Sequence, residues 1–342
     1  MSNVSSNPVG LEAPGSLEAR KRKLRAMMSA AGMLPVLLLL VAGFHFLSGG
    51  RFLTGQNLSI VMQQASVNTV LAAGMTFVIL TGGIDLSVGS ILAAAAMAGL
   101  IVSNVPELSY LWIFAALAVG LGFGILNGLL ISALKLPPFI VTLGSLTAVR
   151  GIARLLGNDT TIFNPQIPYA FIGNGALPIL PGVFSLPWLA VIALLVIVIS
   201  WFVLKRTVFG THIYSVGGNE AAARLSGIKV PRIYLSVYGI SGLFAGLGAV
   251  MLSTRLYAAN GLQLGQAYEL DAIAAVILGG TSFVGGIGSI WGTLIGALII
   301  AALSNGLVLI GVSDIWQYVI KGLVIIGAVA LDRLRQRGSA RT

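Results

Sequence analysis

Residues 72–91 read AAGMTFVILTGGIDLSVGSI: one apolar run stops at two glycines, and a second begins after Asp85 and Ser87. A carboxylate therefore stands between two apolar runs, in a chain of 342 residues that has only 10 Asp and Glu. Similar interrupted runs recur along the chain, many near the roughly 20 residues that a helix needs to cross a bilayer. The stretch predicts the end of one membrane helix, a break, and the start of another.

The composition indicates an all-α polytopic membrane protein. Hydrophobic residues make up 57% of the chain and charged residues 9%, against roughly 25% charged residues in soluble domains. The chain has no cysteine, and its two histidines, His45 and His212, lie far apart, so we predict no disulfide and no metal site. A net charge of +10 can indicate a nucleic-acid-binding protein, but the positions of the charges indicate membrane topology instead.

Hydropathy and helix-breaking residues predict about ten transmembrane helices. Their approximate limits are 30–48, 62–81, 87–104, 111–134, 138–156, 186–204, 233–253, 269–283, 288–309 and 314–331. If the N-terminus lies in the cytoplasm, most of the 20 Lys and Arg residues fall on the cytoplasmic side. This positive-inside asymmetry predicts cytoplasmic N- and C-termini. The predicted domains are a basic tail over 1–29, a membrane domain over 30–331 and a second basic tail over 332–342.

Two long loops are candidates for contacts with other proteins. The outside loop, 157–185, contains four prolines and is either functional or irregular in its packing. The inside loop, 205–232, predicts a turn, a short helix capped by Asn219, a stop at Gly227 and an exit at Pro231. It is either a docking helix on the cytoplasmic face or an ordinary structured loop.

Glycines at four-residue spacing predict closely packed helix faces, since association in lipid depends on close backbone approach. The sets are Gly120 with Gly124, Gly242 with Gly246, and Gly288 with Gly292 and Gly296. A weak internal similarity links VILTGGIDLSVGSI (78–91) with VILGGTSFVGGIGSI (276–290). Internal repeats are a recurring feature of transporters.

No sequence pattern indicates catalysis. The chain lacks the nucleotide-binding pattern G-x-x-x-x-G-K-[ST], the metalloprotease pattern H-E-x-x-H and any Ser/His/Asp set. We therefore predict that the chain is not an enzyme, has no catalytic residue and needs no cofactor.

Amide side chains inside the predicted spans are candidates for lining a translocation pathway, because a polar group in lipid needs a partner. Gln64 and Asn68 lie four residues apart and so on one helix face, and Asn127 and Asn305 lie in other spans. They favour a pathway for a polar, uncharged solute, although hydrogen bonding between helices is the alternative for each. For Lys321, inside the last span, the sequence gives no role.

Three interpretations of Asp85 remain open. It caps the helix that follows the Gly82–Gly83 break, with Ser87 assisting, and its charge is favoured by the helix dipole. Alternatively it lines the pathway or carries protons, or it contacts a partner on the cytoplasmic side. Local capping is favoured because it also explains the glycines. The carboxylates Glu269 and Asp271 are either helix-start charges or docking contacts, and the first interpretation is favoured.

Five stretches, 72–91, 137–155, 215–228, 269–299 and 303–326, closely resemble permease subunits of bacterial ribose-type, carbohydrate-importing ABC transporters. The resemblance implies a multi-pass protein of the inner (cytoplasmic) membrane, in contact with lipid. It also implies a second permease subunit, forming a homodimer around one pathway, a cytoplasmic ABC ATPase and a periplasmic sugar-binding protein. The expected cargo is ribose or a similar monosaccharide.

The resemblance assigns two sets of residues. The ATPase-coupling element comprises Gly218, Asn219, Glu220, Ala222, Ala223, Arg224, Ser226 and Gly227. A structural motif comprises Gly82, Gly83, Asp85, Ser87 and Gly89. The binding protein is expected to dock on loops 157–185 and 255–268. The alternatives are a permease for another small polyhydroxylated solute and an ion-coupled secondary transporter that uses Asp85 as its carrier.

Overall fold

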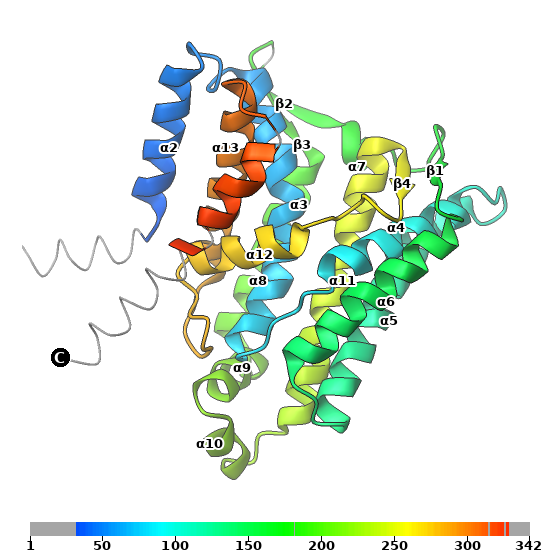
Figure 1. The fold of residues 1–342 in the computed structure, drawn as a ribbon, viewed down its shortest axis with the longest axis vertical. Helices are drawn as coiled ribbons and strands as arrows, with labels where there is room; N and C mark the ends of the chain where they lie inside the picture. The colour runs from blue at the N-terminus through cyan, green and yellow to red at the C-terminus, as the bar shows by residue number, and fades with distance from the viewer. Residues whose placement is uncertain (1–31, 181, 314, 325, 328–342) are drawn as a thin grey trace, which may run out of the picture.

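The computed structural model describes residues 32–180, 182–313, 315–324, 326 and 327, which form an elongated bundle of helices (Figure 1). The principal helices are α2 (Leu34–Leu47), α3 (Gly55–Leu80), α4 (Val88–Ser103), α5 (Trp112–Ala133), α6 (Pro138–Leu156), α8 (Trp188–Arg206), α9 (Val208–Gly218), α11 (Val230–Leu256), α12 (Tyr268–Leu278) and α13 (Ile290–Leu309). The short elements are η1 (Ser109–Leu111), α7 (Phe171–Asn174), α10 (Glu220–Leu225), β1 (Thr161–Phe163), β2 (Ala176–Leu180), β3 (Phe184–Pro187) and β4 (Ala258–Asn260). Residues 315–324 are also helical.

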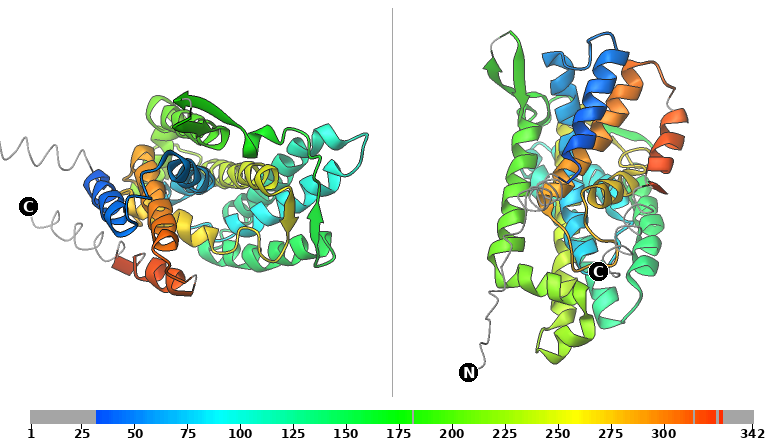
Figure 2. Two further views of the ribbon diagram at one scale, coloured as in Figure 1. Left: turned by 90° about the horizontal axis from the view of Figure 1, so that it is seen from above. Right: turned by 90° about the vertical axis from the view of Figure 1, so that its left-hand side faces the viewer.

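The two ends of the bundle differ. At one end, β1 pairs with β4 and β2 pairs with β3, both antiparallel; we call it the hairpin end. At the other end lie α9 and α10 (Figure 2), and we call it the α10 end. Both strand pairs belong to the loops after α6 and α11.

Six helical segments in the described part of the chain are long and apolar enough to cross a membrane. They are Gly55–Leu80, Ser109–Ala133, Pro138–Leu156, Trp188–Arg206, Val230–Leu256 and Ile290–Leu309, and each overlaps a predicted span. The shorter apolar helices α2 and α4 have 14 and 16 residues. The structure thus confirms a polytopic all-α protein.

The predicted span 269–283 is wrong as a membrane-crossing helix. α12 has 11 residues and is therefore about 17 Å long, against a hydrocarbon core of about 30 Å. It ends before Gly279–Gly280, and Gly280 has a φ of +85°, a conformation that favours glycine. The hydropathy pattern continued past this break. Two predicted spans lie partly outside the described residues, 30–48 and 314–331. The two basic tails, 1–29 and 332–342, lie wholly outside them.

Two breaks between helices meet. Residues 81–87 separate α3 from α4 and run back along the bundle before α4 begins (Figure 1), and residues 279–289 separate α12 from α13. The Gly286 N–H donates a hydrogen bond of 3.0 Å to the Leu80 carbonyl oxygen. These breaks belong to the two similar segments of the sequence, 78–91 and 276–290. Residues 81–87 are mostly buried, so protein surrounds this irregular backbone, whereas Gly280, Val284 and Ile287 of the second break are exposed.

The predicted glycine faces pack against each other. A Cβ at Gly242 on α11 would lie 2.3 Å from the Gly120 carbonyl oxygen on α5, and one at Gly124 would lie 2.4 Å from the Tyr238 oxygen. On α13, a Cβ at Gly296 would lie 1.9 Å from the Ala275 oxygen of α12. These contacts confirm the sequence prediction, because only glycine allows the backbones to approach so closely.

Candidate functional site

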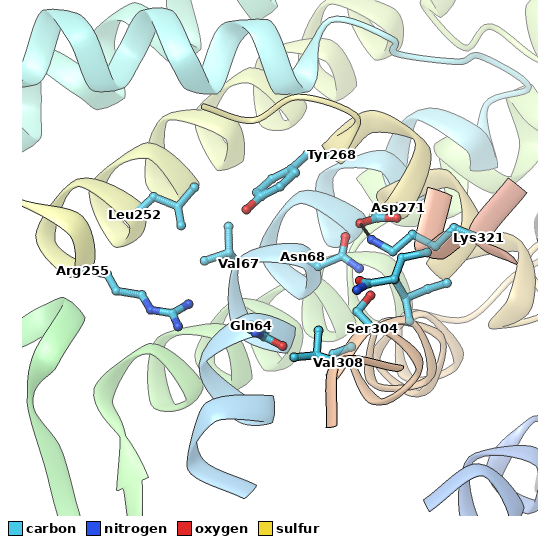
Figure 3. Close-up of a pocket in the computed structure, with 13 residues that line it drawn as sticks. Gln64, Val67, Asn68, Leu252, Arg255, Tyr268, Asp271, Ser304, Val308 and Lys321 are labelled. Carbon is cyan, nitrogen blue, oxygen red and sulfur yellow. Dashed lines mark hydrogen bonds and ion pairs between the residues drawn. The ribbon is translucent and has the colours of Figure 1, made fainter. Parts of the chain in front are cut away.

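A polar cavity of about 290 Å³ lies between α3, α11, α12, α13 and the helical residues 315–324 (Figure 3). Its polar lining residues are Gln64, Asn68, Arg255, Tyr268, Asp271, Ser304, Gln317 and Lys321. They come from five segments that are distant in sequence. We call this space the amide cavity.

The amide cavity lies in the half of the bundle nearer to the hairpin end. Gln64 is two to three turns from the start of α3, or about 14 Å along its axis, and Arg255 is one residue from the end of α11. α12, whose Tyr268 and Asp271 line the cavity, lies across the bundle at mid-height (Figure 1). The cavity is therefore nearer to the hairpin end than to α10.

Lys321 and Asp271 form an ion pair at one side of the amide cavity. The Nζ–Oδ2 distance is 2.9 Å, and the two side chains are 24% and 19% exposed. The pair joins α12 to the helix of residues 315–324, and it also lines a second cavity, of about 190 Å³. It therefore stands between two cavities and gives Lys321 the partner that an intramembrane charge needs.

The structure brings two of the four predicted pathway amides to this cavity. Gln64 and Asn68 line it, as their shared helix face predicts. Neither Nδ2 nor Oδ1 of Asn68 has a hydrogen-bond partner among the described residues, although both atoms are buried. Such a group is unusual, since the great majority of buried polar atoms are paired.

The other two amides form hydrogen bonds between helices. The Asn127 Nδ2 donates to Ser87 Oγ at 2.9 Å, and its Oδ1 accepts from Ser145. The Asn305 Oδ1 accepts from Asn57 Nδ2 at 3.0 Å. This geometry is that of the alternative interpretation, in which amides join helices.

Asp85 is fully buried at the α3–α4 break. Its Oδ1 accepts from the Ser87 N–H at 3.0 Å and from Ser87 Oγ at 2.6 Å, and its Oδ2 accepts from Ser241 Oγ on α11 at 2.8 Å. The predicted cap geometry differs: Ser87 is the N-cap residue of α4, without a side-chain cap, and Asp85 binds Ser87 itself rather than the first-turn amides. Asp85 also does not lie on the surface at the α10 end, because the break turns inward.

The motif glycines allow this inward turn. Gly82 has a φ of +78°. A Cβ at Gly83 would lie 2.5 Å from Tyr238 Oη, and one at Gly89 would lie 2.2 Å from the Gly265 carbonyl oxygen. The motif therefore holds the α3–α4 break against α11 and the loop before α12.

We expect Asp85→Ala to destabilise the protein by about 3 kcal/mol, because the Ser87 and Ser241 donors lose their acceptor inside the bundle. Asp85→Asn keeps one acceptor oxygen and should have an intermediate effect. Thermal unfolding of the detergent-purified protein measures both.

The matched control is Asp159→Ala, which removes an exposed carboxylate. Asp159 forms an ion pair with Arg154 at 2.7 Å, and the hydrogen bond from Arg154 lowers the pKa of the Asp159 carboxyl. Exposed pairs contribute little to stability, and Asp159 has a φ of +57°, where alanine is somewhat less favourable than aspartate, so the melting temperature should fall much less than for Asp85→Ala. Equal melting temperatures for Asp85→Ala and Asp159→Ala would refute the structural role of Asp85.

The α10 end carries the predicted coupling residues. Asn219 caps α10 through a hydrogen bond of 3.0 Å from the Ala222 N–H, and Gly227 ends the segment with a φ of +82°, so the predicted cap and stop are confirmed. Ser226 Oγ donates to the Ala222 oxygen, Ala223 is buried, and Gly218 has open space beside it.

A carboxylate fixes α10 to the long helix α11. Glu220 accepts from Arg224 at 2.6 Å and from Tyr234 Oη, on α11, at 3.0 Å. Leu225, at the end of α10, is 91% exposed. α10 is thus anchored on one side and presents an apolar side chain on the other.

Sequence reasoning did not assign the Asp271–Lys321 pair, Tyr268, Gln317 or Arg255 to a site. Opposite charges in two predicted spans were the available signal, since intramembrane charges tend to pair. Asp271 and Glu269 do lie in the first turn of α12, as expected. Within the described part of the chain, no three His, Cys, Asp or Glu side chains are grouped so as to hold a metal ion.

A multi-helix membrane bundle with a polar cavity and an anchored, exposed helix at one end has the architecture of a membrane transport subunit. Residues 57–329 match the family described as "Branched-chain amino acid transport system / permease component". The chain belongs to this permease family. No solved structure matches the chain.

Similar curated proteins have more specific names. The chain is 46% identical to "Ribose import permease protein RbsC" of Bacillus subtilis (strain 168), over 82% of this chain and 86% of that protein. It is 40% identical to the RbsC of Escherichia coli (strain K12), over 94% and 99%. It is 36% identical to "Galactose/methyl galactoside import permease protein MglC" of the same organism, over 92% and 97%.

Proposed function

We propose that the protein is the membrane permease subunit of an ATP-driven importer that carries ribose or a similar monosaccharide across the bacterial inner membrane. The observation that carries the proposal is the 40–46% identity to proteins named ribose import permeases over 82–94% of the chain. The same type of permease for another small polyhydroxylated solute is the second candidate, supported by the likeness to a galactose and methyl galactoside permease.

The amide cavity favours a sugar over the amino acids in the family description. A free amino acid needs a partner for its ammonium and another for its carboxylate, whereas Lys321 and Asp271 already bind each other. Amides offer both donors and acceptors to uncharged hydroxyls. We infer that this cavity is part of the sugar pathway.

The distribution of charge supports a cytoplasmic α10 end. Lys135, Lys205, Arg206, Lys229 and Arg232 all lie in or beside the segments at this end, as the positive-inside rule expects of a cytoplasmic face. The hairpin end, with residues 157–185 and 257–267, would then face the periplasm and receive a sugar-binding protein.

In the mechanism that we propose, a separate cytoplasmic ATPase binds α10. ATP-driven closure of that subunit moves α9 and α10, and the bundle alternates between forms open to opposite sides. A second copy of the permease completes the pathway. The sugar moves without chemical change.

Leu225→Asp should weaken binding of the ATPase subunit about tenfold or more, because a buried apolar anchor at an interface is commonly worth over 1 kcal/mol. Leu262→Asp, which alters an exposed leucine near the hairpin end, is the control and should leave that binding unchanged. Surface plasmon resonance with immobilised permease measures both. Unaltered binding of Leu225→Asp would argue against α10 as the docking element.

Transport itself tests the proposal. Proteoliposomes with the permease, its ATPase and the binding protein should take up ribose only with ATP, and an uncoupler should have no effect. Uptake that survives ATP depletion but collapses with an uncoupler would instead establish the ion-coupled alternative.

A further inference from the structure

We propose that the amide cavity is a binding site for a neutral polyhydroxylated ligand, in which Asn68 and Gln64 supply the selective hydrogen bonds. This inference rests on the proposed function and adds to it a site within the permease itself. The permease would then select its cargo, in addition to any selection by a separate binding protein.

The unpartnered amide of Asn68 is the first argument. An Asn side chain has two N–H donors and a carbonyl oxygen with two lone pairs, and here both polar atoms are buried with no partner in the described residues. Leaving such a group unpaired costs stability. The side chain is therefore suited to a ligand that offers an acceptor and a donor side by side, as vicinal hydroxyls do.

The neighbours of Asn68 extend the same chemistry. Gln64 lies one turn earlier on α3, and Ser304 approaches from α13 (Figure 3). On the side of the ion pair, Gln317 donates to the Val312 oxygen at 3.2 Å, which orients its amide oxygen as an acceptor. Three helices thus present donors and acceptors to one space, an arrangement that suits several hydroxyls on a small ring.

The charges of the amide cavity favour a neutral ligand. Lys321 and Asp271 neutralise each other across 2.9 Å, so a ligand charge that recruited one of them would have to separate the pair. Arg255 lies at the other side of the cavity, away from the ion pair (Figure 3). The centre of the cavity, around Asn68, therefore offers uncharged polar groups.

The position of the amide cavity suits a ligand that arrives from the hairpin end. The cavity lies toward the hairpin end, and it shares Tyr268, Gln317 and the Asp271–Lys321 pair with the second cavity. Gln266, Tyr318 and Gly322 line only the second cavity, while Asn68 and Gln64 line only the first. A ligand arriving from the hairpin end would meet the amides before the ion pair.

Saturation-transfer NMR of the permease–ATPase complex in nanodiscs, with ribose as the probe and no binding protein, tests the site. Ribose should bind weakly and reversibly. Asn68→Leu and Gln64→Leu should each weaken ribose binding about 3- to 10-fold, the effect of losing one or two ordinary hydrogen bonds. 2-Deoxyribose, which lacks one hydroxyl, should bind less tightly than ribose to the wild type, and the difference should shrink in Asn68→Leu.

Gln63→Leu is the matched control, because Gln63 is the adjacent glutamine on α3 and does not line the cavity. It should keep the ribose affinity within twofold. Co-purification with the ATPase subunit shows that each variant folds. If Asn68→Leu does not co-purify, two milder variants replace it in the comparison of ribose affinities. They are Gln64→Leu, which changes a more exposed side chain, and Ser304→Ala, which changes a smaller one.

Three outcomes of the NMR experiment overturn the inference: no ribose signal at all, equal losses in Gln63→Leu and Asn68→Leu, or displacement of ribose by leucine at equal concentration. The proposed function fails in a different way. If wild-type proteoliposomes take up no sugar with ATP, the proposed function is wrong. Normal ATP-driven uptake by Asn68→Leu and Gln64→Leu, with unchanged KM and sugar preference, would reject only the binding site.

Discussion

Gly217→Ala is expected to abolish ATP-driven sugar uptake, while Gly144→Ala, on the exposed side of α6, should transport nearly normally. A Cβ at Gly217 would lie 1.8 Å from the Leu80 carbonyl oxygen and 2.6 Å from the Gly286 nitrogen. Both atoms are backbone and belong to the hydrogen bond that joins the two helix breaks. A neighbour of this kind cannot rotate away as a flexible side chain can.

The expected loss follows from where Gly217 lies. It is in the last turn of α9, directly before the capped helix α10. It lies against Leu80, the last residue of α3, and against Gly286 in the α12–α13 break. Any movement of α10 therefore reaches both breaks through one contact. Overpacking in such a place costs about 1–3 kcal/mol or more, and it would either separate the breaks or displace α9.

The two variants should be compared by uptake in proteoliposomes and by ATPase stimulation on the same samples. Gly144 is the control because it lies outside the proposed coupling element and a Cβ there meets nothing within 4 Å. A folded Gly217→Ala protein with normal stimulated ATPase but no uptake would place the defect in the pathway, and loss of both would place it in docking. Normal uptake by Gly217→Ala would refute the contact as a transmission point.

Gly124→Leu is expected to prevent stable folding, whereas Gly122→Leu on the same helix should be tolerated. At Gly124 a Cβ would lie 2.4 Å from the Tyr238 oxygen and 3.0 Å from the Gly242 Cα on α11. A leucine would force α5 and α11 apart along their shared glycine face. We expect a destabilisation of about 3 kcal/mol or more.

Gly122 is the matched control because it lies on the exposed side of α5 with nothing within 4 Å. An apolar side chain there has open space. The yield of monodisperse protein and its melting temperature in detergent measure the difference. Similar yields and melting temperatures for the two variants would contradict the packing of α5 on α11.

The sequence predicted the helical elements where apolar runs were long and their ends carried breakers. Asn219 and Gly227 correctly located the ends of α10, because capping is a local interaction. The paired glycine stripes correctly indicated close helix contacts. The prediction failed at α12, because hydropathy measures whether a segment can lie in lipid and not whether protein surrounds it.

The candidate site could be predicted only in part. Gln64 and Asn68 share a helix face, which the helical period fixes from the sequence alone. Asn127 and Asn305 do not line the amide cavity, and each hydrogen-bonds a side chain from another part of the bundle. The Asp271–Lys321 pair joins residues 50 positions apart, a distance over which no local rule operates.

The sequence by itself determined the membrane class, most of the helices, the capped α10 and the likeness to sugar-importing permeases, because these depend on composition and on short-range patterns. Only the tertiary structure decided which polar side chains face a common cavity, where Asp85 lies, and that the two similar breaks touch each other and Gly217. The reason is physical: a buried polar group is defined by the partners that packing brings to it, and those partners come from distant parts of the chain.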